Sequence, residues 1–518
     1  MRRIGGLACA LVIAVVAASC SSTGSHATSG ATASTAPPLT VQPTSGVAGI
    51  PSEVSANADD WPLPGRDYSN SRATNASAIT SANVAQLKPR WTATPSGIGA
   101  LSTAPIVTKD TIYLQGGTGE IVAIDRATGH TRWTRATGFN IGPFGAAIAN
   151  GRVFGDDGSS GVIALDAKTG AVDWRTRITT TKTLGVDVQP TVFAGLVLAS
   201  SVPVSAGGIY AGGDVGRLVA LDAATGKIRW HFDTVKGGTA LWGNPGVNSG
   251  GGAWYPPAID VRRRAVYFGT ANPAPFPGTS AYPNGTSRPG PNLYTDSLVA
   301  LNVDTGKLLW YHQVTAHDLF DRDQVHAMLA SMGNGDQVVI SAGKSGVVVA
   351  LDPATGRVVW QRAIGQHHND DLTTLPGPTE IAPGTYGGVE TPPAATIGVA
   401  YFATVNEPVT LEPNKTAYFG AQMGKHDGEV VALDVATGTV EWDTKVPGDP
   451  LGGVAVVNDL VFTSLLDGTV VAINIDTSKI VWKYKTKGGI NGFLSIAGNT
   501  VYVPVGQASP PELLALSL

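Results

Sequence analysis

A histidine and two carboxylates lie within five residues in the stretch TAHDLFD, residues 315–321. Imidazole and carboxylate groups are common proton-transfer groups in enzymes, so His317, Asp318 and Asp321 could belong to an acid–base site. The alternative is a solvated connection between two strands, because acidic residues are usually exposed. The motif alone leaves both interpretations open. Within it, His317 is expected to be an orienting or structural partner of Asp318 rather than a proton carrier.

Three further residues could bind a planar or anionic ligand. Trp254 follows three glycines in GGGAW, Asn272 precedes a proline in GTANPAPF, and Lys344 stands in AGKSG. They offer a stacking face, an amide oxygen and a positive charge, respectively. Each also has a structural interpretation, since Asn–Pro and Lys–Ser–Gly are typical of turns and a tryptophan beside glycines can cap a channel.

A second polar group lies in GQHHNDD, residues 365–371, with two histidines and two aspartates. His367, His368, Asp370 and Asp371 are residue types that bind metals. Ligand sets usually converge through the fold, however, and neighbours in a Gly- and Pro-rich loop seldom point at one ion. We therefore expect a loop here rather than a metal site.

The elements that position these residues belong to a repeat of seven copies: AIDRATGHTRW (123–133), ALDAKTGAVDW (164–174), ALDAATGKIRW (220–230), ALNVDTGKLLW (300–310), ALDPATGRVVW (350–360), ALDVATGTVEW (432–442) and AINIDTSKIVW (472–482). Each copy predicts a β-hairpin around a D-x-x-T-G turn, in which Asp bonds backbone amides and Gly takes a positive φ. Ser478 replaces that glycine in the last copy. The final Trp lies on the outgoing strand, where its ring can pack against the next repeat.

The spacing of the repeat predicts an all-β, eight-bladed β-propeller. Successive Trp residues lie 41, 56, 80, 50, 82 and 40 residues apart, and two further strand-like runs precede each hairpin. Four strands per unit of about 40 residues are typical of propeller blades. The strand LKPRWTA (87–93) lacks partners, and ELLALSL (512–518) ends where a hairpin turn should begin. Pairing the two would close the ring as an eighth blade.

This arrangement assigns eight of the eleven tryptophans to docking between blades, namely Trp91, Trp133, Trp174, Trp230, Trp310, Trp360, Trp442 and Trp482. Trp61, Trp242 and Trp254 need another explanation. Two blades exceed 80 residues, and their excess is expected to form loops on the rigid ring. Loops of this kind usually carry function.

The N-terminus predicts export. Residues 1–20 combine a basic start, an apolar run and AASC, which is typical of a lipoprotein signal peptide with a lipidated Cys20. Residues 21–59 are rich in Ser, Thr, Ala, Gly and Pro, and predict a disordered tether; residues 60–518 form the propeller. The chain would be held to the outer face of a bacterial membrane through its lipid anchor only. A net charge of −4 argues against a nucleic-acid partner.

The first of the two long blades, which carries the hairpin at residues 300–310, and the segment after it contain GGGAW, GTANPAPF, RPGPNLYT (288–295) and HDLFD in that order. This combination resembles the quinoprotein alcohol dehydrogenases, eight-bladed propellers that use pyrroloquinoline quinone (PQQ) and calcium. The resemblance extends more weakly over residues 61–518. It implies that Trp254 stacks on the quinone, that Asn272 binds calcium, and that Lys344 bonds the quinone oxygens. It also implies that Asp321 is the base that takes the alcohol proton and lies beside the metal.

The sequence departs from that family at three places. A glutamate that binds calcium is missing; Ala211 stands in its place, and Asp214 nearby is the tentative substitute. Calcium is therefore doubtful, because one amide and Asp321 make a weak site. A cysteine pair over the quinone is absent, since the chain has only Cys9 and Cys20. An expected aromatic residue is also missing, with Glu390 and Thr391 in that region.

The resemblance implies an exported dehydrogenase that oxidises an alcohol or polyol with PQQ and passes electrons to an external acceptor. Neither cysteine stands in a haem-attachment motif. Two alternatives remain open. The chain could be a non-catalytic propeller lipoprotein that binds envelope proteins, or a propeller that binds a sugar or another small ligand on its stacking indole.

Overall fold

The computed structural model describes residues 39, 42–43, 45–139, 142–158, 160–179, 184–186, 188–203, 215–235, 242–244, 246–416 and 423–518. All of them belong to one compact unit, Thr35–Leu518. None of the helices among these residues is long and apolar enough to cross a membrane.

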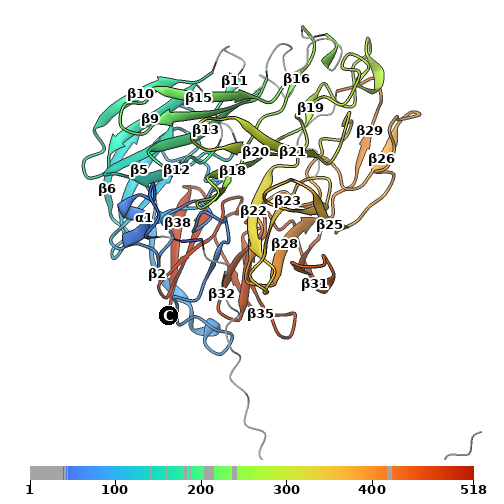
Figure 1. Cartoon of the computed structure of the whole chain (residues 1–518). Helices are drawn as coiled ribbons and strands as arrows, with labels where there is room; N and C mark the ends of the chain where they lie inside the picture. Colours follow the sequence, from blue (N-terminus) through green and yellow to red (C-terminus); the bar gives the residue numbers. More distant parts are fainter. Residues whose placement is uncertain are drawn as a thin grey trace, which may run out of the picture. The chain divides into compact units, whose positions relative to one another are not determined.

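Eight four-stranded antiparallel sheets form the blades (Figure 1). The first blade consists of β3 (Ile106–Val107), β4 (Thr111–Gln115), β5 (Glu120–Asp125) and β6 (Thr131–Ala136), and the second of β7 (Ala147–Ala149), β8 (Arg152–Asp156), β9 (Gly161–Asp166) and β10 (Val172–Arg177). The third blade consists of β12 (Thr191–Phe193), β13 (Leu196–Pro203), β14 (Arg217–Asp222) and β15 (Ile228–Asp233), with β11 (Leu184–Gly185) beside β13. The fourth blade consists of β17 (Ala258–Asp260), β18 (Ala265–Gly269), β20 (Ser297–Asn302) and β21 (Leu308–Gln313).

The fifth to eighth blades complete the ring. They are β22 (His326–Ser331), β23 (Gln337–Ala342), β24 (Val347–Leu351) and β25 (Val358–Ala363); β27 (Ala394–Ala395), β28 (Val399–Val405), β30 (Gly428–Asp434) and β31 (Val440–Val446); β32 (Ala455–Val457), β33 (Leu460–Ser464), β34 (Thr469–Asn474) and β35 (Lys479–Lys485), with β1 (Ala73–Thr74) parallel to β32; and β36 (Ser495–Ala497), β37 (Thr500–Val505), β38 (Glu512–Ser517) and β2 (Lys88–Ala93).

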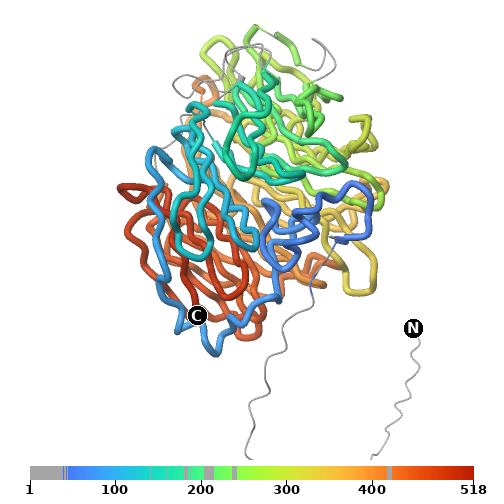
Figure 2. The backbone as a smooth tube through the Cα atoms, turned by 90° about the vertical axis from the view of Figure 1, so that its left-hand side faces the viewer, coloured from blue at the N-terminus to red at the C-terminus, as the bar shows by residue number. Residues whose placement is uncertain are grey.

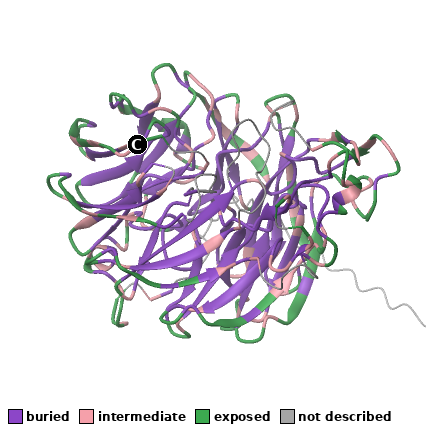
Figure 3. Ribbon diagram, turned by 90° about the horizontal axis from the view of Figure 1, so that it is seen from above, coloured by how far each residue is buried: buried purple, intermediate pink, exposed green. Residues whose placement is uncertain are grey.

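The ring closes as predicted from the two unpaired strands. β2 pairs antiparallel with β38, and Trp91 lies opposite Ala515. Figures 1 and 2 show the blue N-terminal strand beside the red C-terminal segment. The three inner strands of each blade are mostly buried, because neighbouring blades cover both of their faces; the exposed residues lie mainly on outer strands and turns (Figure 3). This explains the near-continuous apolar runs of the inner strands.

The docking role of the repeat tryptophans is confirmed. Six of them donate from Nε1 to a backbone carbonyl of the next blade over 2.8–3.2 Å, namely Trp91, Trp133, Trp174, Trp230, Trp310 and Trp360. Each ring also lies against the turn glycine of the following hairpin. At Gly356 (φ +70°), an added Cβ would lie 2.5 Å from a ring carbon of Trp310. The glycine is therefore required both for its positive φ and for the space that the indole fills.

Replacing Gly356 by alanine is expected to lower the free energy of unfolding by about 2–5 kcal/mol. Left-handed backbone costs a residue with Cβ about 1–2 kcal/mol, and overpacking against Trp310 adds about 1–3 kcal/mol. Gly151 is the matched control, because it has φ +73° but no atom within 4 Å of the added Cβ. Urea unfolding of both variants tests this difference; equal losses would show that the indole contact adds nothing.

The segment from residue 49 to residue 72 joins the blades on one face of the ring. Its hydrogen bonds reach each of the eight blades in turn, at Val107, Asn150, Ala194, Ile259, Leu329, Ala395, Val454 and Leu494. Arg72 is fully buried, donates to the carbonyls of Val454 and Leu494, and lies 5.4 Å from the ring centre of Trp61. This hub therefore links the ring through one continuous stretch of chain.

The prediction of a disordered tether over residues 21–59 is wrong for the last part of that range. Residues 45–59 include α1 (Ser52–Ala56), in which Val54 is fully buried, and the Glu53 carboxylate accepts hydrogen bonds from the N–H groups of Asn150 and Gly151. Composition favoured disorder, but Pro51, Val54 and Asn57 are buried here, and Glu53 bonds this stretch to the second blade. The predicted signal peptide and Cys20 lie outside the described residues.

The two long blades carry their extra residues as loops, as predicted. The fourth-blade loop contains β16 (Ser249–Gly250) paired with β19 (Pro273–Ala274), and η2 (Pro283–Gly285); the sixth-blade loop contains β26 (Thr379–Ile381) paired with β29 (Val409–Leu411). Another short helix, η1 (Val84–Gln86), precedes β2. Phe276, Leu319 and Ile381 belong to one apolar cluster. The two insertions therefore stabilise each other above the blades that carry the candidate site.

Candidate functional site

The fourth and fifth blades bring the predicted site residues to one end of their inner strands. Asp321 precedes β22 and Lys344 follows β23, and these strands are antiparallel with His326 opposite Ala342. This register places the two segments side by side, so that the Lys344 N–H donates to the Asp323 carbonyl over 3.2 Å. Asn272 follows β18 of the fourth blade. Residues that lie up to 90 positions apart in the sequence, from Trp254 to Lys344, thus become neighbours through the packing of two blades.

Lys344 is the centre of the site. Its Nζ lies 2.9 Å from Oδ2 of Asp321 and 2.7 Å from Oδ2 of Asp323, and all three side chains are buried. The same Nζ lies 4.7 Å from the ring centre of Trp254, within the range of a cation–π contact. The ammonium is therefore held between two carboxylates and the face of an indole.

Asn272 is joined to this group by its backbone. Its N–H donates to Oδ1 of Asp323 over 2.7 Å, and its side-chain amide donates to the Pro273 carbonyl over 3.1 Å. The structure thus brings together Trp254, Asn272, Asp321 and Lys344. Asp323 connects them and was not predicted, although its position two residues after Asp321 was the available signal.

The aspartates occupy strained backbone positions. Asp321 has φ +65° and Asp323 has φ +30°, values that cost a non-glycine residue about 1–3 kcal/mol each. Between them, Arg322 turns away to donate to the Asp370 carbonyl over 2.8 Å and lies over the ring of Phe320. Backbone strain at two acids that share one cation is typical of a site rather than of a passive connection.

Burial and neighbouring charges perturb the proton affinities in the site. Burial raises the pKa of Asp321 well above its ordinary value; the Lys344 ammonium lowers it, and the charge of Asp323 raises it. Burial lowers the pKa of Lys344, but both carboxylates act against this effect and leave that pKa well above its ordinary value. Lys344 therefore remains charged, while Oδ1 of Asp321 has no hydrogen-bond partner and is available to accept a proton.

Two glutamates of the sixth blade add to the negative charge around Lys344. The charge of Glu390 helps to raise the pKa of Lys344. Burial raises the pKa of Glu390 to about 7, and the charge of Glu407 acts in the same direction. Oε2 of Glu390 is buried without a partner. In the sequence, Glu390 was noted only because an expected aromatic residue is missing from its region, and no local motif indicated Glu407.

The remaining polar motif residues have structural roles. Asp318 accepts hydrogen bonds from the N–H groups of Phe320 and Arg322 over 2.7 and 2.8 Å, and so shapes the turn that presents Asp321. The expectation that His317 would pair with Asp318 is wrong. Its ring instead contacts the carbonyls of Arg288 and Asn284 in the fourth-blade loop.

The loop histidines do not form a metal site. His367 bonds Asp370 over 2.7 Å, whereas His368 bonds Asn369. Throughout the described part of the chain, no three His, Cys, Asp or Glu side chains are grouped so that they could hold a metal ion. Asp214, the tentative metal ligand, lies outside the described residues, as does Ala211.

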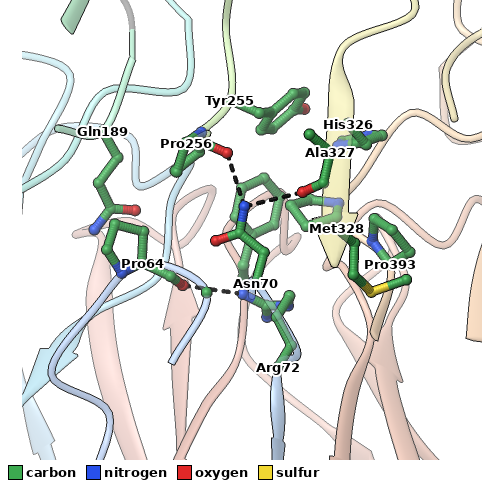
Figure 4. A pocket seen from close by; sticks show the side chains of 13 residues that line it. Pro64, Asn70, Arg72, Gln189, Tyr255, Pro256, His326, Ala327, Met328 and Pro393 are labelled. Atoms are coloured by element: carbon green, nitrogen blue, oxygen red, sulfur yellow. Dashed lines mark hydrogen bonds between the residues drawn. The ribbon is translucent and has the colours of Figure 1, made fainter. Parts of the chain in front are cut away.

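A small cavity of about 30 Å³ lies near the ring axis, with Pro64, Asn70 and Arg72 of the hub in its wall (Figure 4). Asn70 donates to the carbonyls of Pro256 and Ala327, which joins the fourth and fifth blades. The rings of His326 and Tyr255 also line it, with their centres 4.4 Å apart and their planes tilted by 38°. Since about 10–15 Å³ holds one water, this space fits roughly two waters and no cofactor.

The other two tryptophans outside the repeat are structural. Trp61 is fully buried and donates to the Pro64 carbonyl over 3.3 Å, and Trp242 donates to the Leu293 carbonyl over 2.9 Å. Trp254, by contrast, keeps part of its surface accessible. It is thus the tryptophan among these three whose ring lies against the charged site.

Comparison with known proteins places these residues in a family. The family model described as "Glucose/ethanol/alcohol dehydrogenase, beta-propeller domain", from the PQQ group, matches residues 61–143 and 149–363. A second model, "Outer membrane protein assembly factor BamB", matches residues 426–516. The first match contains all the described candidate site residues except the two sixth-blade glutamates.

Individual relatives agree with this assignment. The chain is 28% identical over 409 residues to a quinohemoprotein alcohol dehydrogenase of Comamonas testosteroni, with 70% of this chain and 56% of the relative covered. It therefore spans little more than half of the length of that relative. The crystal structure of the enzyme from that organism superposes with a TM-score of 0.77 at 23% identity, over 89% of this chain and 80% of the other.

A structure of BamB from Moraxella catarrhalis is less similar, with a TM-score of 0.51 at 17% identity over 83% of this chain and 98% of that one. At such identities the structural likeness shows the propeller fold alone. The family model, in contrast, matches more than half of the chain and spans the blades that hold Trp254, Asn272, Asp321 and Lys344. The chain belongs to the PQQ family of glucose, ethanol and alcohol dehydrogenase β-propellers.

Proposed function

We propose that this chain is a quinoprotein dehydrogenase that binds PQQ at the end of the fourth and fifth blades and oxidises an alcohol or polyol. The observation that carries the proposal is the contact group of Asp321, Lys344 and Trp254: a buried carboxylate with an unpartnered oxygen, an ammonium, and an indole face below it. Membership of the PQQ family makes a quinone the natural ligand for this group.

The described residues fit the quinone. A planar aromatic anion needs an aromatic face and a cation at its oxygens, and Trp254 and Lys344 supply both within one contact. When bound, PQQ would supply a two-electron acceptor for the hydride of the alcohol. Trp254 would hold its plane, and Lys344 would bond its oxygens.

The described residues do not fit calcium. That ion takes six to eight oxygen ligands, whereas the acids beside Asn272 are already bonded to the Lys344 ammonium. The positive charge that a metal supplies in a site of this kind is here supplied by Lys344. We therefore derive no catalytic step through a metal ion.

Asp321 performs the proton transfer in this proposal. Its unpartnered Oδ1 accepts the hydroxyl proton of the alcohol, while Oδ2 stays fixed by Lys344 at 2.9 Å. The raised pKa of Asp321, caused first by burial, makes it a stronger base once ionised. Asp323 holds the same ammonium from the other side, and its bond to the Asn272 N–H fixes the distance between the two blades.

Reconstitution tests the proposal. The purified chain is incubated with PQQ, with and without calcium, and assayed with an artificial electron acceptor over a panel of primary alcohols and polyols. We expect acceptor reduction that depends on PQQ and on at least one alcohol. Absence of both PQQ binding and acceptor reduction under every condition would contradict the proposal.

Export and lipidation of Cys20 remain part of the proposal, supported by the basic and apolar N-terminus and by the AASC motif. An external electron acceptor belongs to it as well, because neither cysteine stands in a haem-attachment motif. Mass spectrometry of the membrane fraction is expected to find a lipidated N-terminal Cys20. An unmodified Cys20 in that fraction would contradict the proposed lipid anchor.

A further inference from the structure

Oxidation of an alcohol to a carbonyl compound releases two electrons and two protons. If the electrons leave for an external one-electron acceptor, as the proposed function requires, the two protons must leave the buried site as well. Asp321 and Lys344 are enclosed, so a proton needs further groups to reach the surface. The sixth blade places such groups next to Lys344.

We propose that Glu390, followed by Glu407 and His426, forms the route by which protons leave the site. This inference rests on the proposed function and assigns a role to the sixth-blade insertion. In each step a carboxylate oxygen or the imidazole accepts a proton from the preceding group and passes it on, and water accepts it from His426. No atom other than hydrogen moves along the route.

The backbone sets Glu390 beside Lys344. The Val389 N–H donates to the Gly343 carbonyl over 3.0 Å, which places the next residue against the segment that carries Lys344. The Tyr255 hydroxyl donates to the Glu390 carbonyl over 2.8 Å and fixes its backbone from the side of the fourth blade. The Glu390 side chain keeps a partly accessible surface, while its Oε2 has no partner. It is thus fixed at its backbone and available at its carboxyl.

Glu407 continues the route on the same blade. It follows β28, and its Oε2 accepts a hydrogen bond from the Tyr386 N–H over 2.7 Å. The Asn406 N–H donates to the Asp427 carbonyl over 3.0 Å, which brings Glu407 next to the segment of His426. Nδ1 of His426 is buried without a partner, but the residue as a whole is partly exposed. The route therefore ends at the surface.

The charges around these groups suit proton transfer near neutral pH. Burial raises the pKa of Glu390 to about 7; Lys344 lowers it, and Asp323 and Glu407 raise it. Tyr386 also faces this group, and burial raises the pKa of Tyr386 to about 12, so that it stays protonated. Burial raises the pKa of Glu407, which is opposed by His426. Glu390 can thus both accept and release a proton under working conditions.

The axial cavity offers a poorer exit. His326 lines it with an unpartnered Nε2, but burial lowers the pKa of His326 to about 3, so it does not become protonated near neutral pH. The buried guanidinium of Arg72 lies in the wall of the same cavity, and its positive charge opposes a proton there. Glu390 and Glu407 of the sixth blade, in contrast, carry no positive charge.

Two half-reactions of the PQQ-loaded enzyme separate this route from the oxidation itself. Single-turnover reduction by alcohol without an acceptor is followed by stopped-flow absorbance, and steady-state turnover is followed with ferricyanide as the one-electron acceptor. In Glu390→Gln we expect turnover to fall at least tenfold, with single-turnover reduction changed less than twofold. The conservative Glu390→Asp variant should recover part of the turnover.

Glu380→Gln is the matched control, because Glu380 is an exposed carboxylate of β26 in the same insertion. It should leave both half-reactions unchanged. Equal turnover in Glu390→Gln and wild type would overturn the proton route while leaving the proposed function intact. If wild type shows no single-turnover reduction, the proposed function fails, and the route fails with it.

The ligand-free protein gives a second measurement. Carbon-13 NMR of glutamate carboxyl groups, assigned by the loss of one signal in Glu390→Gln, should show a group that titrates near pH 7. Titration of that signal near pH 4.5, like an exposed glutamate, would overturn the route without any use of PQQ.

Discussion

Asp321→Asn is expected to lower alcohol turnover by about 10²–10⁴-fold, the usual contribution of a general base, while the protein remains folded and still binds PQQ. The amide has nearly the same shape as the carboxylate, and its oxygen can still accept the Lys344 hydrogen bond, but it cannot take the hydroxyl proton. Lys344 stays paired with Asp323 at 2.7 Å in this variant. Steady-state kinetics of the PQQ-loaded protein, together with a PQQ titration, provide the measurement.

Asp371→Asn is the control for this experiment. Asp371 is an exposed acid in the loop after the fifth blade and should leave turnover unchanged. Turnover within threefold of wild type in Asp321→Asn would show that another group takes the proton. A simultaneous loss of PQQ binding would assign Asp321 to the binding of the cofactor instead of to proton transfer.

Lys344→Met is expected to lower the free energy of unfolding by about 3–5 kcal/mol, the usual cost of breaking a buried ion pair. The change leaves Asp321 and Asp323 buried together with no cation between them. Adding Asp323→Asn should recover much of this loss, because it removes one of the two unpaired charges. Urea unfolding of the single and double variants at pH 8 measures both effects.

The loss should also depend on pH. Without Lys344, both aspartates have pKa values further above 3.8 in the folded protein, so the folded state binds protons that the unfolded state has released. Stability of Lys344→Met therefore falls as the pH rises above about 4, and the loss is smaller at pH 5 than at pH 8. A loss independent of pH, or no recovery in the double variant, would show that packing of the lysine stem outweighs its charge.

The architecture could be predicted from the sequence because the repeat is local. A D-x-x-T-G turn followed by Trp determines a hairpin and a docking contact within eleven residues, and seven copies leave little freedom for anything but a ring. Even the closure followed from two strands without partners, which the structure joins through Trp91 and Ala515. The sequence predicted this long-range pair only because all other strands were already paired.

The hub could not be predicted in this way. Asn70 and Arg72 stand in a polar, turn-rich stretch, and a buried arginine is unusual by composition. Its burial is tolerated because carbonyls from the seventh and eighth blades accept its N–H groups, and those carbonyls lie about 400 residues away in the chain. No local pattern carries this information.

The candidate site was predicted in part. Trp254, Asn272, Asp321 and Lys344 were chosen by their resemblance to a family, and the structure brings them together. Asp323 was missed although it lies two residues after Asp321, and Glu407 was missed because its proximity depends on how the fifth and sixth blades pack. His317 shows the opposite case: closeness in sequence suggested a contact with Asp318, whereas its ring contacts the carbonyls of Arg288 and Asn284.

The most direct test of the account is calorimetric titration of the purified chain with PQQ, for wild type and for Trp254→Leu. We expect one PQQ per chain in wild type, with or without calcium, and an affinity at least tenfold lower in Trp254→Leu because the stacking face is lost. Absence of binding in wild type, or equal binding in both proteins, would contradict a quinone site built on Trp254 and Lys344.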